Sequence, residues 1–461
     1  MLFTEARFLA FFAVVFGVHW ALRNHRARKL WLLVASYAFY AGWDWRFLGL
    51  IVFSTLVDFV AALRMRAEPG GSVRRRLWLS ASLAANLGVL GLFKYWDFFL
   101  TSGVEFLAYL GLGIEPRTLS LVLPVGISFY TFQTMSYTID AYRGRLEATE
   151  DLADFALFVA FFPQLVAGPI VRASTFLPQL KAARPFAEVA GRSCLLLFLF
   201  GYIKKACVAD NIAAWVDPVF TDPAQAATSS LLLGAALYAI QIYCDFSGYS
   251  DMAIAAAGLL GYSLPLNFDA PYLATTMTDF WRRWHISLSS WFRDYLYLPL
   301  GGNRSGPTRT LVNLFLVFLL CGLWHGAGWN FVIWGLFHGL VLVVERLTRA
   351  REARRLGVLR WALTLGLATL AWIPFRAQSL ADSGTYVAGL FRSGGAELIA
   401  PVSWILIVAL LLLQLMLRRT NLAPRLAALP HPVFAVAYGA AVALTLPWVA
   451  ASYEPFIYFQ F

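Results

Sequence analysis

Two histidines lie in apolar, aromatic-rich stretches of this sequence and could act as catalytic bases. His325 belongs to LWHGAGWNFVIWGLFHG, residues 323–339, and His285 lies upstream in FWRRWHISLSSWFRDYLYLPLGG, residues 280–302. An ionisable group within apolar sequence is costly unless it is buried among helices or faces water, so it is a candidate functional residue. An imidazole can take a proton from a hydroxyl group as that hydroxyl attacks an activated acyl group, which typically accelerates a reaction ~10² to 10⁴-fold. His325 is the first candidate for this role and His285 the second.

Other catalytic chemistries lack their sequence signatures near these histidines. There is no HExxH motif, no cysteine cluster and no carboxylate in a helical i, i+4 relation to either histidine, so no metal site is expected. A serine hydrolase would need a GxSxG nucleophile elbow, and none is present near them. The cysteines Cys194, Cys207, Cys244 and Cys321 show no CxxC spacing and are interpreted as small apolar packing residues. Two interpretations therefore remain for each of these two histidines: general-base catalysis or a purely structural role.

The other histidines favour structural roles. His19 and His25 lie at the end of the first apolar run and in the basic loop after it, and His431 lies between prolines, so all three are expected at the membrane interface. His338 lies on the apolar run that follows His325, where a buried histidine satisfied by a neighbour is the favoured interpretation.

The elements that must position these residues are membrane helices. The chain has 461 residues, of which 60% are hydrophobic and only 14% charged, so lipid is the expected solvent for most of it. The apolar runs are near twenty residues long, which favours helices over a barrel. The net charge of +11 comes from basic residues clustered between apolar runs, a pattern of membrane topology rather than of nucleic-acid binding. An all-α, multi-pass membrane protein is predicted.

We expect about eleven to thirteen membrane segments, some of them re-entrant, in one domain that covers residues 1–461. Because basic loops are expected on the cytoplasmic side of the membrane, both ends of the chain are expected on the outer side. Prolines and glycines interrupt residues 151–192, which are interpreted as re-entrant or interfacial. The segment 121–145 is expected to return to the inner face and to be kinked or broken at Pro124 and Gly126. The other spans are expected at residues 8–22, 30–43, 47–63, 77–100, 195–212, 231–260, 310–323, 331–344, 361–375, 402–417 and 433–451.

Three features of this arrangement bear on function. His325 lies where two short helices, residues 310–323 and 331–344, meet at a break that can border a cavity, and His285 lies in an amphipathic segment expected along the inner face. Lys204 and Lys205 fall within an expected span. They could pair with an acid such as Asp210, which is favoured, or face an anionic ligand.

The motifs resemble those of a known family. LPVGISFYTFQTMSYTIDAYRG, FFPQLVAGPI, QIYCDFSGYSDMAI, the two histidine motifs and the terminal FIYFQF are similar to the membrane-bound O-acyltransferase family, in particular its bacterial polysaccharide branch. The likeness spans nearly the whole chain, and the two histidine motifs in this order are highly specific.

The resemblance implies a fold and an activity. It implies a funnel from one face and a donor channel from the other, which meet at the catalytic His325, with His285 at a second functional position. It also implies a bacterial inner-membrane enzyme that moves acetyl groups from cytoplasmic acetyl-CoA, a substrate rather than a bound cofactor, to an exported polysaccharide. A periplasmic or extracellular partner of the SGNH type would complete the transfer. The acceptor stays open among alginate, cellulose, peptidoglycan and other glycans.

Alternatives remain at this stage. The acyl group could pass to peptidoglycan, a lipid or a protein hydroxyl, or the polar cavity could belong to a polysaccharide or small-molecule transporter, although no paired repeats with matching broken helices occur. Tyr458 in the tail FIYFQF could carry the acyl group as a covalent relay, or the tail could be an aromatic belt that closes the last helix.

Overall fold

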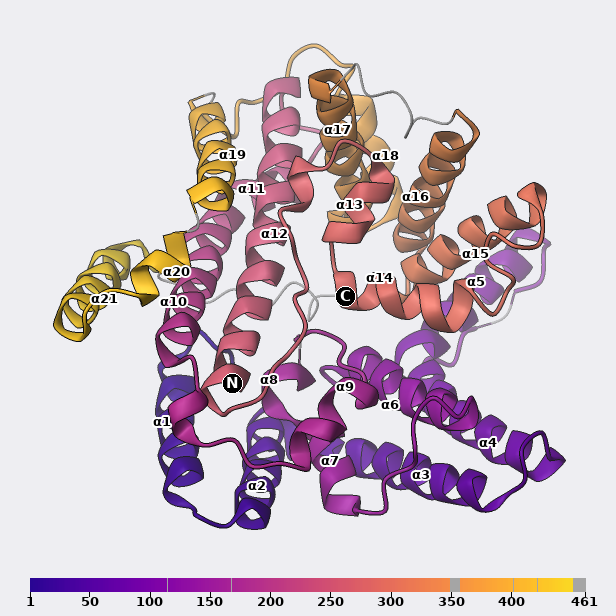
Figure 1. Ribbon diagram of the computed structural model, residues 1–461. Helices are drawn as coiled ribbons and strands as arrows, with labels where there is room; N and C mark the ends of the chain where they lie inside the picture. The colour runs from indigo at the N-terminus through magenta and orange to yellow at the C-terminus, as the bar shows by residue number, and fades with distance from the viewer. Residues whose placement is uncertain (114, 167, 349–356, 401, 421, 451–461) are drawn as a thin grey trace. The chain divides into compact units, whose positions relative to one another are not determined.

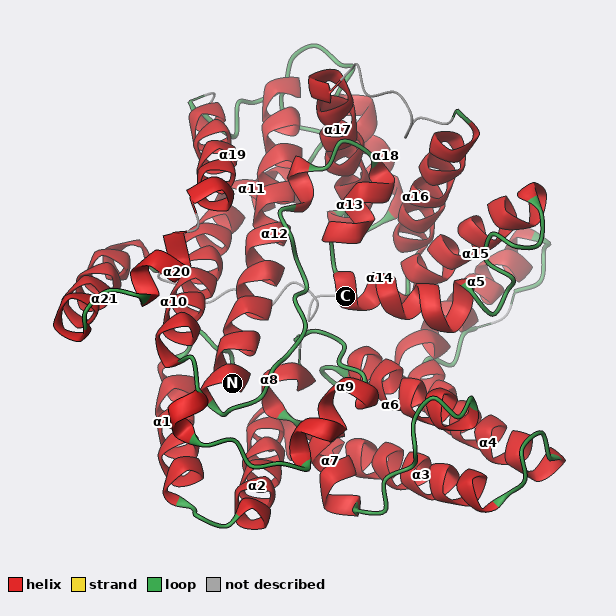
Figure 2. Ribbon diagram, in the orientation of Figure 1, coloured by secondary structure: helices red, strands yellow, loops and turns green. Residues whose placement is uncertain are grey.

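The computed structural model describes residues 1–450 apart from residues 114, 167, 349–356, 401 and 421. Every regular element in this described part is a helix (Figure 2), and one isolated bridge pairs Ala226 with Ala396. The prediction of an all-α protein is confirmed.

The chain forms two compact units. Unit 1 comprises residues 1–189 and 257–265, and unit 2 comprises residues 190–256 and the chain from residue 266 onward. The single domain expected over residues 1–461 stays a prediction.

Unit 1 consists of helices and short 3₁₀ or π turns, the latter labelled η (Figure 1). They are α1 Ala6–Ala21, α2 His25–Asp44, η1 Trp45–Phe47, α3 Leu48–Ala67, α4 Val73–Leu90, η2 Gly91–Tyr95, α5 Trp96–Tyr109, α6 Ile127–Tyr142, α7 Leu152–Ala160, α8 Phe162–Leu165, α9 Ala173–Phe176, η3 Leu177–Leu180 and η4 Phe186–Glu188. Polar residues start several of these helices: the side chain of Asn24 accepts a hydrogen bond from the N–H of Ala27, and that of Ser72 from Arg75.

The core of unit 1 is built around α6, which packs against α3 and α4 and is buried on nearly all of its surface. The predicted break before it is confirmed, because α6 begins only after Gly126, whose φ is +77°. A Cβ at Gly126 would lie 2.5 Å from the carbonyl oxygen of Leu165, so both the backbone angle and the space require glycine. Residues 151–192 form only short helices, in agreement with the interruptions in their sequence, and their depth in a membrane stays a prediction.

Unit 2 contains both candidate histidines and most of the long helix α12, which is labelled in Figure 1. Its elements are α10 Gly191–Tyr202, η5 Ile203–Ala209, α11 Asp210–Thr221, α12 Thr228–Leu259, whose last residues belong to unit 1, η6 Pro271–Leu273, α13 Met277–Arg283, α14 Ile286–Phe292, η7 Arg293–Tyr297, α15 Pro307–His325, α16 Trp329–Leu347, α17 Gly357–Arg376, α18 Leu380–Gly389, α19 Ser403–Thr420, α20 Leu422–Ala427, α21 His431–Thr445 and η9 Leu446–Trp448.

Two elements differ from the sequence-based expectation. Between the spans expected at residues 361–375 and 402–417, where no helix was expected, the chain forms α18, which begins at an N-cap formed by Ser379 and buries Tyr386 against Phe220, with 4.6 Å between the ring centroids. The span expected to end near residue 100 continues through α5 to Tyr109. The cap at Ser379 and the burial of Tyr386 stabilise α18, whereas α5 continues the span with a largely apolar sequence and buries no side chain.

Seven helical segments in the described part of the chain are long and apolar enough to cross a membrane. They are His25–Ala67, Val73–Tyr109, Thr228–Leu259, Pro307–His325, Trp329–Leu347, Gly357–Arg376 and His431–Trp448. Two shorter apolar helices, Ala6–Ala21 and Ser403–Leu412, accompany them. The chain is a multi-pass membrane protein, and its orientation and total number of segments stay predictions.

The two lysines in the span 195–212 pair with carboxylates, as favoured from the sequence. Lys204 forms an ion pair with Asp251. The Nζ atom of Lys205 lies 2.6 Å from Oδ1 of Asp210 and 2.7 Å from Oδ1 of Asp245, and these three side chains are at most 5% exposed. The ion pairs therefore tie η5 and α11 to α12.

Candidate functional site

His325 is the last residue of α15 and lies directly before the turn that reverses the chain into α16. The helix ends there because Gly326 and Gly328 adopt extended conformations. A Cβ on Gly326 would overlap the ring of Phe331, so only glycine fits at this turn. The predicted break at WHGAGWN is confirmed, although both helices are longer than expected, at 19 residues each.

Glycines also bring the two helices of this hairpin into backbone contact. A Cβ on Gly322 would overlap the carbonyl oxygen of Phe331, and a Cβ on Gly335 would overlap that of Phe318. Small residues at such a crossing allow close van der Waals packing between membrane helices. The position of His325 is thus fixed by a tightly packed pair of helices rather than by a loop.

His285 occupies the junction between α13 and α14 in a left-handed conformation, with φ +42° and ψ +56°. This conformation is uncommon for a residue other than glycine and persists only where the surroundings impose it. Asn267 does so from a neighbouring loop. Its backbone carbonyl accepts from the N–H of Ile286 at 2.9 Å, and its side-chain oxygen accepts from both the N–H and the hydroxyl of Ser287, at 3.2 and 2.9 Å.

Replacing Asn267 by alanine is expected to loosen the junction that holds His285. The change removes the buried acceptor of Ser287 and the donor to the hydroxyl of Ser250, so it should cost about 1–3 kcal/mol of stability. Thermal unfolding in detergent and acyl-transfer rates would measure it, and Asn211→Ala, at an exposed position of α11 that does not line the cavity, is a suitable control. An Asn267→Ala protein with unchanged stability and rate would contradict the assignment.

The two candidate histidines lie beside the same tryptophan. The ring centroid of Trp324 lies 5.9 Å from that of His285 and 5.0 Å from that of His325. Both imidazoles are buried, with 0% and 3% exposure, among further aromatic rings that include Phe246 beside His285 and Phe375 beside His325. Burial lowers the pKa of His285, which lies outside the seven candidate spans, to about 3, so this imidazole is neutral at pH 7.

A row of ring side chains extends from His325 through Trp334 and His338 to Trp281. Trp334 packs edge-on against His325 at 4.8 Å and against His338 at 4.7 Å. The indole N–H of Trp281 lies 3.4 Å from Nδ1 of His338. His338 is thus buried beside a hydrogen-bonding neighbour, as predicted, and Trp281 links it to the surface of a cavity.

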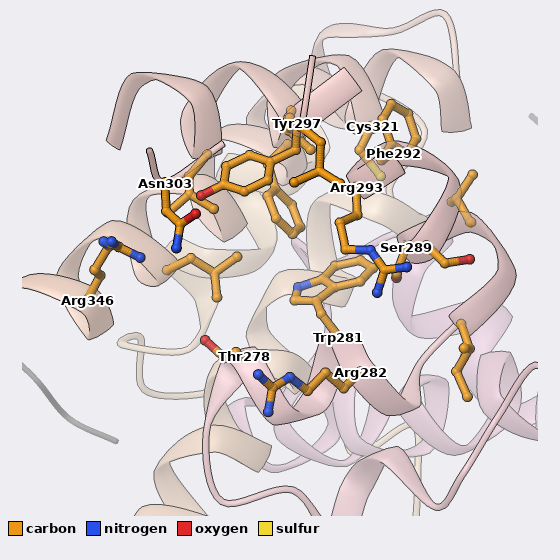
Figure 3. Close-up of a pocket in the computed structure, with 18 residues that line it drawn as sticks. Thr278, Trp281, Arg282, Ser289, Phe292, Arg293, Tyr297, Asn303, Cys321 and Arg346 are labelled. Atoms are coloured by element: carbon orange, nitrogen blue, oxygen red, sulfur yellow. The ribbon is translucent and has the colours of Figure 1, made fainter. Parts of the chain in front are cut away.

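That cavity has a volume of about 490 Å³ and lies between α13, α14, η7, α15 and α16. Trp281 lies among three arginines of the lining: in Figure 3, Arg346 is to its left, Arg293 to its right and Arg282 below it. The lining is apolar near Phe318 and Cys321 and includes neither His285 nor His325. Asp294 forms two hydrogen bonds with the guanidinium of Arg293, which raises the pKa of that arginine.

The cavity combines fixed positive charge with an apolar wall. Arginine presents planar N–H groups that suit phosphate and carboxylate ligands. Glu345 of α16 holds α13 in place at the wall of the cavity. Its carboxylate accepts hydrogen bonds from the N–H and the hydroxyl of Thr278, at 2.9 and 2.6 Å. This arrangement can bind an anionic group that carries an apolar arm.

Sequence reasoning found the two histidines but not the residues that organise their surroundings. Asn267, Trp281 and Trp334 were missed, although Trp281 and two of the arginines lie in the motif that drew attention to His285. Tyr458 lies outside the described residues, and its role as a relay stays a prediction. The roles of His285 and His325 in catalysis also stay predictions.

The comparisons with known proteins agree on one family. The family model for the membrane-bound O-acyltransferase family matches residues 143–373, half of the chain, and this range includes both histidines. The chain is 42% identical to a probable alginate O-acetylase, AlgI, of Pseudomonas aeruginosa over 86% of its own length and 76% of the relative's.

Two further relatives are similar to the chain over most of its length. A probable alginate O-acetylase of Azotobacter vinelandii is 42% identical over 86% of this chain and 79% of its own. A peptidoglycan O-acetyltransferase of Helicobacter pylori is 39% identical over 82% of this chain and 76% of its own. The match to the family model and these identities show that the chain belongs to the membrane-bound O-acyltransferase family and is an O-acyltransferase.

Proposed function

We propose that this enzyme transfers an acetyl group from acetyl-CoA, bound from the cytoplasm, to a hydroxyl group on the path to an exported polysaccharide. The observation that carries the proposal is that two buried histidines both lie beside Trp324. A row of aromatic and imidazole rings connects one of them, His325, with the arginine-bordered cavity. A base buried among aromatic rings is shielded from water, which would otherwise compete for the activated acyl group.

His325 acts as the general base in this proposal. It takes the proton of the acceptor hydroxyl while the hydroxyl oxygen forms a bond to the acetyl carbonyl carbon. The carbon–sulfur bond to coenzyme A then breaks, and the proton passes from the imidazolium to the departing thiolate, so that protons and bonds balance. His285, neutral and held by the turn at Asn267, assists from the other side of Trp324.

The arginine-bordered cavity is the proposed site of the donor. The phosphates of acetyl-CoA match Arg282, Arg293 and Arg346, and its pantetheine arm matches the apolar wall that leads toward Trp281. Trp281, through His338 and Trp334, connects this wall with His325.

Neutralising two of these arginines is expected to weaken donor binding without affecting the chemical step. The double variant Arg282→Gln/Arg346→Gln should raise KM for acetyl-CoA about 10-fold or more and leave kcat nearly unchanged, because it removes binding that is equal in the ground and transition states. Arg304→Gln, an exposed arginine that does not line the cavity, is the matched control. Equal KM values for the double variant and the control would exclude the cavity as the donor site.

The acceptor is proposed to be an exported polysaccharide such as alginate, because two relatives that are 42% identical are named as probable alginate O-acetylases. Peptidoglycan is the second candidate, favoured by the similarity to a peptidoglycan O-acetyltransferase. Location in a bacterial inner membrane, a periplasmic SGNH-type partner and an acyl relay at Tyr458 belong to the same proposal. Removal of residues 456–461 tests the relay: acetyl export that survives this deletion at normal protein levels would exclude it.

The proposed function is tested with the purified protein in liposomes. Labelled acetyl-CoA is supplied on one side, and label is measured in alginate oligosaccharides, in peptidoglycan fragments and on the protein, with and without a candidate partner enzyme. Transfer that depends on His325 supports the enzyme. Movement of a polysaccharide or small molecule that continues without acetyl-CoA and without His325 would instead support a transporter.

A further inference from the structure

Unit 1 contains a carboxylic acid that is buried in a membrane helix among neutral partners. Asp58 of α3 is 0% exposed. Ser82 of α4 lies 2.5 Å from its Oδ1 atom, and Nδ2 of Asn86, one turn further along α4, lies 2.8 and 2.9 Å from its two oxygens. The side chains of Ser54, Thr134 and Thr138 extend this network to α6.

No cation compensates this carboxyl group among the described residues. Asp58 forms no ion pair there, in contrast to Asp210, Asp245 and Asp251, which pair with lysines. Tyr137 of α6 interacts electrostatically with Asp58, and its phenol oxygen accepts a hydrogen bond from the N–H of Thr149. A bare negative charge inside a membrane helix bundle is costly, whereas a neutral acid in hydrogen bonds is not.

The number of hydrogen-bond donors in the network also favours a neutral carboxyl group at Asp58. Asn86 has two amide hydrogens, one of which goes to the carbonyl of Ser82 at 3.0 Å, so one remains for Asp58. If Asp58 is ionised, the single hydroxyl hydrogen of Ser82 must point to it. The hydroxyl of Thr138, 3.2 Å beyond Ser82, then receives no hydrogen from Ser82.

One added proton completes the chain. If Asp58 carries a proton, its O–H can donate to Oγ of Ser82, so that the hydroxyl of Ser82 donates to Oγ1 of Thr138 and Thr138 donates to the carbonyl of Met135 at 3.1 Å. On the other side, Oδ1 of Asn86 accepts from Ser54 at 2.5 Å. Every hydroxyl in the chain from Asp58 to Met135 then both donates and accepts.

We propose that Asp58, Ser82 and Asn86 form a proton-binding site, in which one proton on the carboxyl group joins α3, α4 and α6. Release of this proton places an uncompensated charge at the junction of the three helices. The proton is therefore part of the folded structure of unit 1, in the same way that a bound ligand would be.

Infrared spectroscopy of the purified full-length protein in lipid nanodiscs tests the protonation state. The proposal expects a carbonyl stretch of a protonated carboxylic acid at neutral pH that shifts in D₂O and disappears in Asp58→Asn. Asp251→Asn, which removes an acid that pairs with Lys204, is the control and should leave the band in place. A spectrum without an Asp58-dependent acid band would overturn the proposal.

Exchanging the two partners gives a second test that does not depend on the infrared band. Asp58→Asn should change the Tm in detergent by less than about 2 °C. Asn86→Asp alone places two acids side by side, so its Tm should be lower and should fall further as the pH rises. The double variant Asp58→Asn/Asn86→Asp has one acid and one amide again and should recover the parent Tm.

The same melting curves distinguish a proton from a metal ion. The proposal expects equal Tm values in sodium, potassium and choline chloride. A rise in Tm specific to sodium that Asp58→Asn abolishes would show an ionised carboxylate that binds a cation, and would overturn the proposal, as would failure of the double variant to recover the parent Tm.

Discussion

Replacement of His325 by alanine should abolish acyl transfer while the protein still folds. Loss of a general base typically costs ~10² to 10⁴-fold in rate. His325 is the last residue of α15, at the turn into α16. The packing of these two helices depends on the close contact at Gly322 and Gly335 rather than on the imidazole. The rate of acetyl transfer in liposomes and the Tm in detergent should therefore respond very differently to this substitution.

Two controls make the result interpretable. His431→Ala removes an exposed histidine at the start of α21 and should leave both quantities unchanged. His325→Gln keeps a hydrogen-bonding side chain of similar size but cannot accept a proton at neutral pH, so it should be as inactive as alanine. An active His325→Gln protein would refute general-base catalysis by this residue.

Replacement of Lys205 by methionine is expected to produce the largest loss of stability in unit 2. The change removes the ammonium that Asp210 and Asp245 both contact, and breaking a buried ion pair from one side costs about 3–5 kcal/mol. The measurements are the yield of folded protein and its Tm in detergent. Lys181→Met, an exposed lysine, is the control.

A combined variant separates the charge from the shape of the side chain. Lys205→Met with Asp210→Asn and Asp245→Asn removes all three charges together and should recover most of the stability, since neutral partners of similar volume replace a buried ionic group at little cost. A stable Lys205→Met protein, or a combined variant no better than the single one, would show that the buried ion pairs contribute little.

The sequence was sufficient for features that depend on local pattern. Twenty-residue apolar runs predicted helices, Pro124 with Gly126 predicted a break, and the interruption between the apolar runs 310–323 and 331–344 predicted the break between α15 and α16. The pairing of Lys204 and Lys205 with acids followed from the cost of unpaired charge in lipid.

Features assembled from distant residues could not be predicted in this way. Asn267 controls the turn at His285 from a loop, where no periodicity marks it. The arginine-bordered cavity exists only because α13, η7 and α16 come together. Asp58 and its partners lie on three helices, and nothing in the sequence marks these particular polar residues as neighbours.

The contact between α15 and α16 has a mechanical consequence. Because Gly322 and Gly335 bring the two backbones together, neither helix can slide or rotate against the other without a clash, so the hairpin behaves as one rigid lever. Any displacement of His325 would therefore move α16 as well, together with His338 and the part of the cavity wall that Leu342 and Arg346 form.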